Sequence, residues 1–148
     1  MNSALIDKYV IELLKKNGWY KGRKVDISFW INELSKEGYS CFEYAIEILE
    51  ELGGIEVNVG NSNGYKGAMF DFNPYNAASG EYDRIERFEI SVGEKLYPIG
   101  SMGQAIAYVG DKQNIYFGDW RTFYWHGENL EDYLNRLFKM SCKPVQII

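Results

Sequence analysis

The sequence predicts an α+β fold, with N-terminal helices and a C-terminal helix packed on one face of an antiparallel sheet of mostly five to six strands. Two observations predict this class. Apolar residues recur with helical spacing up to Leu52 and again over 130–140. From Ile55 the apolar period changes from about 3.6 residues to about 2, which is typical of half-buried strands. The 148 residues are predicted to form a single domain, 1–148.

Three helices are predicted before residue 53, at 4–16, 27–36 and 41–52. Each follows a residue whose side chain can accept a hydrogen bond from a free backbone N–H group. The predicted capping residues are Ser3, Asp26 and Ser40, the last in a capping box with Glu43. The first helix carries an apolar stripe made of Leu5, Ile6, Tyr9, Val10, Leu13 and Leu14.

The second half of the chain is predicted to be mostly strands, with a polar turn at 60–67 and a hairpin turn at Gly110–Asp111. The predicted strands are 55–59, 68–72, 85–92, 104–109 and 115–119, with an edge strand at 123–125 and a short strand within the tail, 144–148. The closing helix, 130–140, is capped by Asn129. The residues predicted to be buried on the sheet are Phe42, Ile46, Leu49, Leu130, Leu134 and Leu137.

Charge is uneven along the chain, whose formal net charge is −5. Residues 41–94 hold 11 acidic and 3 basic side chains, whereas the flanking thirds are close to neutral. Along the predicted third helix no Lys or Arg at helical spacing compensates Glu43, Glu47 and Glu51. This acidic middle is either a solvated face or a docking face for a basic partner. Direct nucleic-acid binding is not expected, because a basic footprint is missing.

The sequence predicts a cytoplasmic protein. No apolar run reaches membrane-spanning length, and the N-terminus lacks the basic and apolar regions of a signal peptide. Cys41 and Cys142 form no metal or redox spacing and are expected to be reduced thiols.

The sequence offers little catalytic chemistry. His126 is the single histidine, so a multi-histidine metal site is excluded, and neither a metal nor a cofactor is expected. Cys41 at a predicted helix start could have a lowered thiol pKa, although a structural, partly buried cysteine fits the helix phase better. Carboxylate pairs such as Asp71 with Glu81 and Asp83 with Glu86 are expected by chance among 21 acidic residues.

Six segments, taken in order, resemble the SUKH superfamily of immunity proteins, most closely the SUKH-3 type. They are 23–39 with its Gly-aromatic stop, 45–55 at a helix-to-strand junction, 70–74 ending in Pro, the apolar-Pro-apolar-Gly segment 93–100, the hairpin, and the closing helix 127–137. The usual Asp-x-x-Gly turn is replaced by Gly110 to Asn114, where Asn114 is expected to supply the left-handed conformation.

The resemblance implies function by binding. Such proteins are encoded with bacterial polymorphic toxins and neutralise the cognate toxin as stoichiometric inhibitors, not as enzymes. An acidic inhibitor suits a basic toxin domain such as a nuclease. The expected partner-binding residues are the carboxylates Glu43, Glu47, Glu51, Glu81 and Asp83 and the aromatic anchors Tyr82, Trp120 and Tyr124.

Two alternatives stay open at this point. The chain is alternatively a non-catalytic regulatory or scaffold module of the same fold, which the absence of a neighbouring toxin gene would favour. The second alternative is a small enzyme that uses Cys41 or a carboxylate pair, and Cys41→Ser tests its thiol version.

Overall fold

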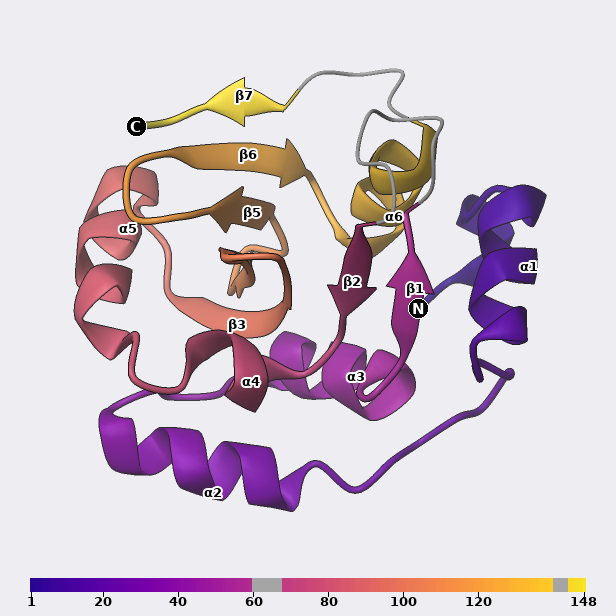
Figure 1. Cartoon of the computed structure of the whole chain (residues 1–148), viewed down its shortest axis with the longest axis horizontal. Coiled ribbons are helices and arrows are strands. Elements are labelled where there is room, and N and C mark those ends of the chain that lie inside the picture. Colours follow the sequence, from indigo (N-terminus) through magenta and orange to yellow (C-terminus); the bar gives the residue numbers. More distant parts are fainter. Residues whose placement is uncertain (60–67, 140–143) are drawn as a thin grey trace.

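In the computed structural model, which describes residues 1–59, 68–139 and 144–148, seven strands form one antiparallel sheet (Figure 1). The strands lie across the sheet in chain order, so the topology is a meander. Their bounds are β1 Glu56–Asn58, β2 Met69–Asp71, β3 Leu96–Met102, β4 Ala105–Gly110, β5 Ile115–Gly118, β6 Phe123–Gly127 and β7 Val145–Gln146. The turn predicted at 60–67, together with Met140 and Cys142, lies outside the described residues.

Helical segments come before the sheet, between its strands and after β6, which confirms the α+β class. In Figure 1, α1 lies at the right, α2 along the lower edge and α5 at the left of the curved sheet. The bounds are η1 Ser3–Leu5, α1 Lys8–Lys16, α2 Ser28–Glu37, α3 Glu43–Leu52, α4 Pro74–Ala78, η3 Tyr82–Arg84, α5 Ile85–Val92 and α6 Leu130–Lys139.

Helices cover both faces of the sheet, whereas the sequence pattern predicted one covered face. Phe88 of α5 stacks on Phe123, and Tyr133 of α6 makes an edge contact with Phe70. The cross-strand register, with side chains alternating along each strand, puts Phe123 and Phe70 on opposite faces. This two-sided cover explains why β3 and β4 are buried along almost their whole length.

The strand predicted at 85–92 is wrong, because this segment forms helix α5. Ile85 and Phe88 are buried, whereas Ile90 is 75% exposed, so burial follows the helical period rather than alternation. The helix ends at Gly93, whose φ of +68° is a left-handed conformation that glycine adopts without strain. Ile85 and Phe88 therefore pack onto one face of the sheet instead of forming a strand of it.

The sheet has seven strands, more than the five to six that were predicted, because both the predicted edge strand and the tail strand join it. Leu96–Met102 forms a long strand, β3, that takes the place of the strand predicted at 85–92. Pro98 cannot donate a ladder hydrogen bond and argues against a central strand. The structure accommodates it at an irregularity, since the β3–β4 register shifts between Pro98 and Gly100. The predicted edge strand is β6, and it is not an edge because β7 pairs with it.

Two predicted helix starts differ from the structure. An extended residue, Ile6, separates η1 from α1, so the helical phase changes and Leu5 and Tyr9 of the predicted stripe are exposed. The capping box of Ser40 does not form, because α3 begins after Phe42 and the Ser40 hydroxyl instead accepts a hydrogen bond from Lys95. The second helix begins at Ser28, whose N–H and hydroxyl both donate to Asp26.

The β4–β5 hairpin is confirmed, but its left-handed residue is Gln113, with φ of +79°, and not Asn114. The Asn114 side chain is already engaged. Its Nδ2 donates to Glu94 at 3.1 Å, and its Oδ1 accepts from Trp125 Nε1 at 2.9 Å. Asn114 therefore fixes the hairpin through its side chain, and the backbone turn is made one residue earlier.

The core prediction is largely confirmed. Leu49 of α3 and three leucines of α6 are buried, whereas Phe42 and Ile46 are half-buried at the edge of the core. The buried leucines of α6 are Leu130, Leu134 and Leu137. The helix starts as predicted at Asn129, whose Oδ1 accepts a hydrogen bond from the N–H of Asp132 at 2.8 Å.

Candidate functional site

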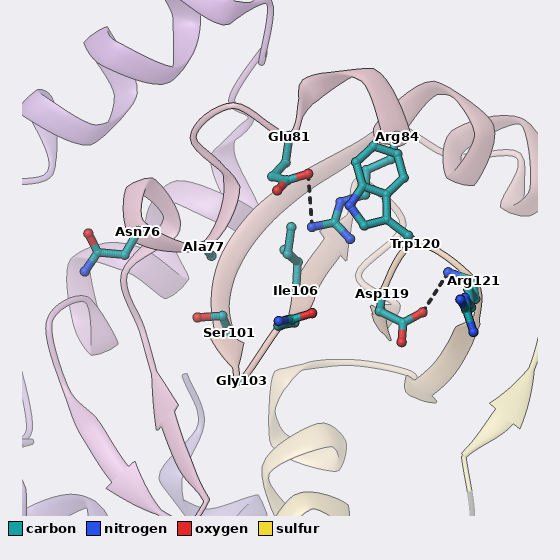
Figure 2. A pocket seen from close by; sticks show the side chains of 11 residues that line it. Asn76, Ala77, Glu81, Arg84, Ser101, Gly103, Ile106, Asp119, Trp120 and Arg121 are labelled. Atoms are coloured by element: carbon teal, nitrogen blue, oxygen red, sulfur yellow. Dashed lines mark hydrogen bonds and ion pairs between the residues drawn. The ribbon is translucent and has the colours of Figure 1, made fainter.

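A hollow of about 840 Å³ opens beside Trp120, over the face of the sheet that α5 covers (Figure 2). It lies between α4, the turn η3, the β3–β4 turn and the β5–β6 loop. Its lining residues are Asn76, Ala77, Glu81, Arg84, Ser101, Gly103, Gln104, Ile106, Asp119, Trp120 and Arg121. We call this the Trp120 hollow. It brings together Glu81 and Trp120, two residues that the sequence predicted for partner binding.

Arg84 is the most unusual residue of the hollow, because its side chain is charged and only 5% exposed. Its Nη2 lies 3.3 Å from Glu81 Oε2, and Figure 2 shows this ion pair. The indole of Trp120 covers the guanidinium, whose central carbon lies 4.7 Å from the ring centroid. Among the described residues, Arg84 Nε and Nη1 have no hydrogen-bond partner. Two nitrogens of the guanidinium are therefore buried without an acceptor for their N–H groups.

The core near Arg84 holds a second polar group, although it does not line the hollow. The Tyr108 hydroxyl is buried and has no hydrogen-bond partner among the described residues. Burial raises the pKa of Tyr108, and the positive charge of Arg84 opposes that rise. The two groups are thus close enough to interact electrostatically. This part of the core keeps two polar groups incompletely paired, which is uncommon in folded proteins.

The loop that presents Trp120 is fixed by local hydrogen bonds. Asp119 Oδ1 accepts from the backbone N–H groups of Arg121 at 2.7 Å and Thr122 at 2.9 Å. These two bonds hold the pKa of Asp119 below its usual value, with Thr122 contributing most. Arg87 donates to the Trp120 carbonyl at 3.3 Å. The Trp120 backbone is therefore held in place while its side chain stays 51% exposed.

The carboxylates of α3 lie elsewhere, and tertiary contacts compensate two of them. Glu43 and Glu47 are exposed. Glu51 lies 3.1 Å from the N-terminal ammonium and accepts from Trp19 Nε1 at 2.9 Å, and Glu50 lies 3.9 Å from Lys24. No basic residue within α3 neutralises these carboxylates, but residues that precede α2 in the chain do. Only part of the predicted acidic face remains available to a partner.

The remaining predicted residues do not join the Trp120 hollow. Tyr82 is 41% exposed and packs edge-on against Tyr39 with ring centroids 5.0 Å apart. Asp83 is exposed in the same short turn, η3. Tyr124 is half-buried in β6 and pairs with Gln146 of β7. Tyr82 and Asp83 are nevertheless sequence neighbours of Glu81 and Arg84, which line the hollow.

The thiol of Cys41 is not activated, whereas burial raises the pKa of Asp71, one of the paired carboxylates. Cys41 is half-buried, and burial raises the pKa of its thiol to about 11, so little thiolate forms near neutral pH. Burial, with the nearby charge of Arg136, lowers the pKa of His126 to about 4. In the described part of the chain, no group of three or more His, Cys, Asp or Glu residues could hold a metal ion. The same residues include no helix with the length and apolarity of a membrane span.

Sequence reasoning missed Arg84, Gln104 and Asp119 as residues of the site. A signal for Arg84 was present, because the acidic segment 41–94 holds only Lys66, Arg84 and Arg87 as basic residues. Both arginines reach Trp120 in the structure. Gln104 gave no signal, since a glutamine in a β-turn is unremarkable in sequence.

An exposed tryptophan over a buried arginine is the composition of a binding surface, because Trp and Arg are enriched among residues that dominate interface energies. The fold and this site define a small α+β protein with an exposed tryptophan over a buried arginine. The chain belongs to the SUKH-3 immunity protein family, whose model matches residues 6–140. Comparisons with curated proteins and with solved structures give no significant match.

Proposed function

We propose that this protein is an immunity protein that binds and neutralises a cognate toxin of a bacterial polymorphic toxin system. The observation that carries this proposal is the family match over residues 6–140. Inhibition is stoichiometric and non-catalytic, and it takes place in the cytoplasm of the toxin-producing cell. The exposed Trp120 and the exposed acidic side chains of α3 support a binding role.

The toxin domain that fits this surface is basic, as a nuclease would be. Glu43 and Glu47 are exposed on α3, and Asp83 is exposed near the Trp120 hollow. Exposed carboxylates of this kind accelerate the encounter with a basic partner and make it dependent on salt. Glu51 contributes less, because the N-terminal ammonium already neutralises it.

Aromatic side chains hold the complex after the encounter. Trp120 is the leading candidate because its indole is half exposed while its backbone is fixed by Arg87 and Asp119. A rigid anchor loses little conformational entropy on binding. Tyr82 is the second candidate, and Tyr124 the third, since it is only half exposed in β6.

The test is co-expression with the toxin domain encoded next to this gene, followed by calorimetry of the purified pair. We expect protection of the cells and a one-to-one complex. Cys41→Ser should protect as well as the unmodified protein. The absence of protection and of binding, with a toxin that kills when expressed alone, would contradict the immunity function.

The electrostatic part has its own test. The double variant Glu43→Lys and Glu47→Lys should slow association by about tenfold at low salt and much less at high salt. Glu12→Lys on α1 controls for a charge reversal away from α3, because Glu12 is exposed and pairs with Lys15 at 3.6 Å. Glu43→Lys alone gives the comparison at equal change of net charge. Equal association rates for all three variants at low salt would remove α3 from the interface.

A further inference from the structure

We propose that the Trp120 hollow is a carboxylate-binding site that receives an Asp or Glu side chain of the partner protein. The identity of the partner rests on the proposed immunity function, whereas the chemistry of the site rests on Arg84. The site thus adds a recognition element of opposite sign to the acidic surface of α3.

The first step is the state of the Arg84 guanidinium. Nη2 faces Glu81 at 3.3 Å, but this approach is an ion pair without an aligned hydrogen bond, and Nε and Nη1 have no partner among the described residues. A buried donor without an acceptor destabilises the fold. A carboxylate can accept in two parallel bonds from Nη1 and Nη2, or from Nε and Nη2, but not from Nε and Nη1, because Cδ lies between those two nitrogens. A ligand that binds Nη1 and Nη2 would thus satisfy the open Nη1 while it shares Nη2 with Glu81.

The second step is the local charge. Arg84 lies under the Trp120 ring, Arg87 donates to the Trp120 carbonyl, and Arg121 follows Trp120 in the chain and lines the hollow. Three carboxylates are nearby. Asp83 is exposed in η3, Glu81 is paired with Arg84, and Asp119 accepts the N–H groups of its own loop. The charges are equal in number, but the two carboxylates that line the hollow are already engaged, and the open nitrogens of Arg84 remain available to an anion.

The third step is access. The Trp120 indole covers the guanidinium from one side, and Figure 2 shows Arg84 between Glu81 and this ring. The indole is 51% exposed, so it can shift toward solvent without leaving a buried cavity. An incoming carboxylate takes the position opposite Nη1 and Nη2, and the displaced indole packs on the apolar atoms of the same partner. One movement therefore creates both the ion pair and the aromatic anchor.

Gln104 offers a test that spares the fold. It lines the hollow from the β3–β4 turn and is exposed. Gln104→Glu places a competing negative charge at the mouth of the hollow, and Gln104→Lys places a positive charge at the same position. The two variants are matched in site and in exposure, so opposite effects report charge rather than disruption.

The direct experiment is a titration of the whole protein with N-acetylglutamate α-amide, followed by NMR of arginine Nε–H and tryptophan indole N–H signals. Trp120→Phe and Arg84→Lys identify the two resonances. We expect saturable shifts of both signals, no such shift with the glutamine analogue, and affinity about fivefold weaker in Gln104→Glu and stronger in Gln104→Lys. No saturable shift, or equal shifts with both ligands, would overturn the proposal.

Inorganic phosphate is the second probe. If phosphate saturates the Arg84 signal at lower concentration than the glutamate analogue, the hollow takes small anions and the assignment to a partner side chain is overturned. Weaker binding of phosphate than of the glutamate analogue supports it.

The neighbouring toxin domain separates the two proposals. If the unmodified protein binds the toxin and Gln104→Glu weakens the complex while Gln104→Lys does not, the carboxylate site is part of the interface. If both variants bind as tightly as the unmodified protein, the carboxylate site is overturned and the immunity function stands. If the toxin is not bound at all, the immunity function fails, and the glutamate titration still decides the chemistry of the hollow.

Discussion

Replacing Glu94 should destabilise the β4–β5 hairpin, because this buried carboxylate joins the start of β3 to the hairpin turn. Glu94 is 7% exposed. It accepts hydrogen bonds from the Lys112 N–H at 3.0 Å, Asn114 Nδ2 at 3.1 Å and the Tyr116 hydroxyl at 2.5 Å. Its side chain also occupies the space over Gly110, where a Cβ atom would collide with the carboxylate.

The magnitude follows from these three bonds. A hydrogen bond to a charged acceptor contributes about 1.5–3 kcal/mol, and part of this is recovered when water reaches the half-buried donors. Glu94→Ala should therefore lower the free energy of unfolding by about 3–5 kcal/mol. Glu94→Gln should cost about 1–3 kcal/mol, because its amide NH₂ faces donors where an acceptor is needed.

Urea unfolding followed by tryptophan fluorescence and circular dichroism measures both costs. Glu86→Gln is the control, because Glu86 is exposed on α5, and it should change stability by less than about 0.5 kcal/mol. A cycle with Tyr116→Phe should give a coupling energy of about 1–2 kcal/mol. A decrease in the free energy of unfolding of less than about 1 kcal/mol for Glu94→Ala would refute the reasoning, because three hydrogen bonds to a buried carboxylate should contribute more than that.

Three further outcomes are expected. Burial lowers the pKa of His126 to about 4 in the folded state, so between about pH 6.5 and pH 4 the unfolded chain binds a proton that the folded chain does not. The free energy of unfolding should therefore be highest above about pH 6.5 and decrease by about 3 kcal/mol toward pH 4. His126→Phe should reduce this pH dependence in urea titrations across the same range. Leu49→Ala should lower the free energy of unfolding by about 2–5 kcal/mol in the same assay, because Leu49 is buried. Ile90→Ala should lower it by less than about 0.5 kcal/mol, because Ile90 is exposed on α5. A loss for Ile90→Ala as large as for Leu49→Ala would mean that α5 buries Ile90. Gly38→Ala should lower the melting temperature by several degrees, because φ is +114° there and the new Cβ would lie 2.7 Å from the Tyr82 ring.

The order of helices and strands could be predicted where one apolar period runs without interruption. The α3-to-β1 junction has a helical stripe up to Leu52 and alternation from Ile55, and both elements form within the predicted ranges. Helix α6 likewise combines a capping asparagine with regularly spaced leucines. These features can be read from the sequence because a cap and an apolar period involve residues only a few positions apart.

Segment 85–92 shows why local reasoning fails elsewhere. Ile85, Phe88 and Val92 have helical spacing, but Ile90 adds alternation, so both periods can be read over eight residues. Whether the segment forms a helix or a strand depends on Tyr108 and Phe123, whose rings contact Phe88 on one face of the sheet. Those residues lie 20 or more positions further along the chain, and their location is unknown until the sheet forms.

The sequence by itself determined the α+β class, the buried leucines of α3 and α6, and the family to which the chain belongs. It also indicated Trp120 and Glu81 separately as binding residues. Only the tertiary structure decided that α3 shares its charge with Lys24 and the N-terminus, and that Arg84 lies between Glu81 and Trp120. The reason is that charge pairing and burial depend on distances across the fold, which the spacing of residues along a chain does not contain.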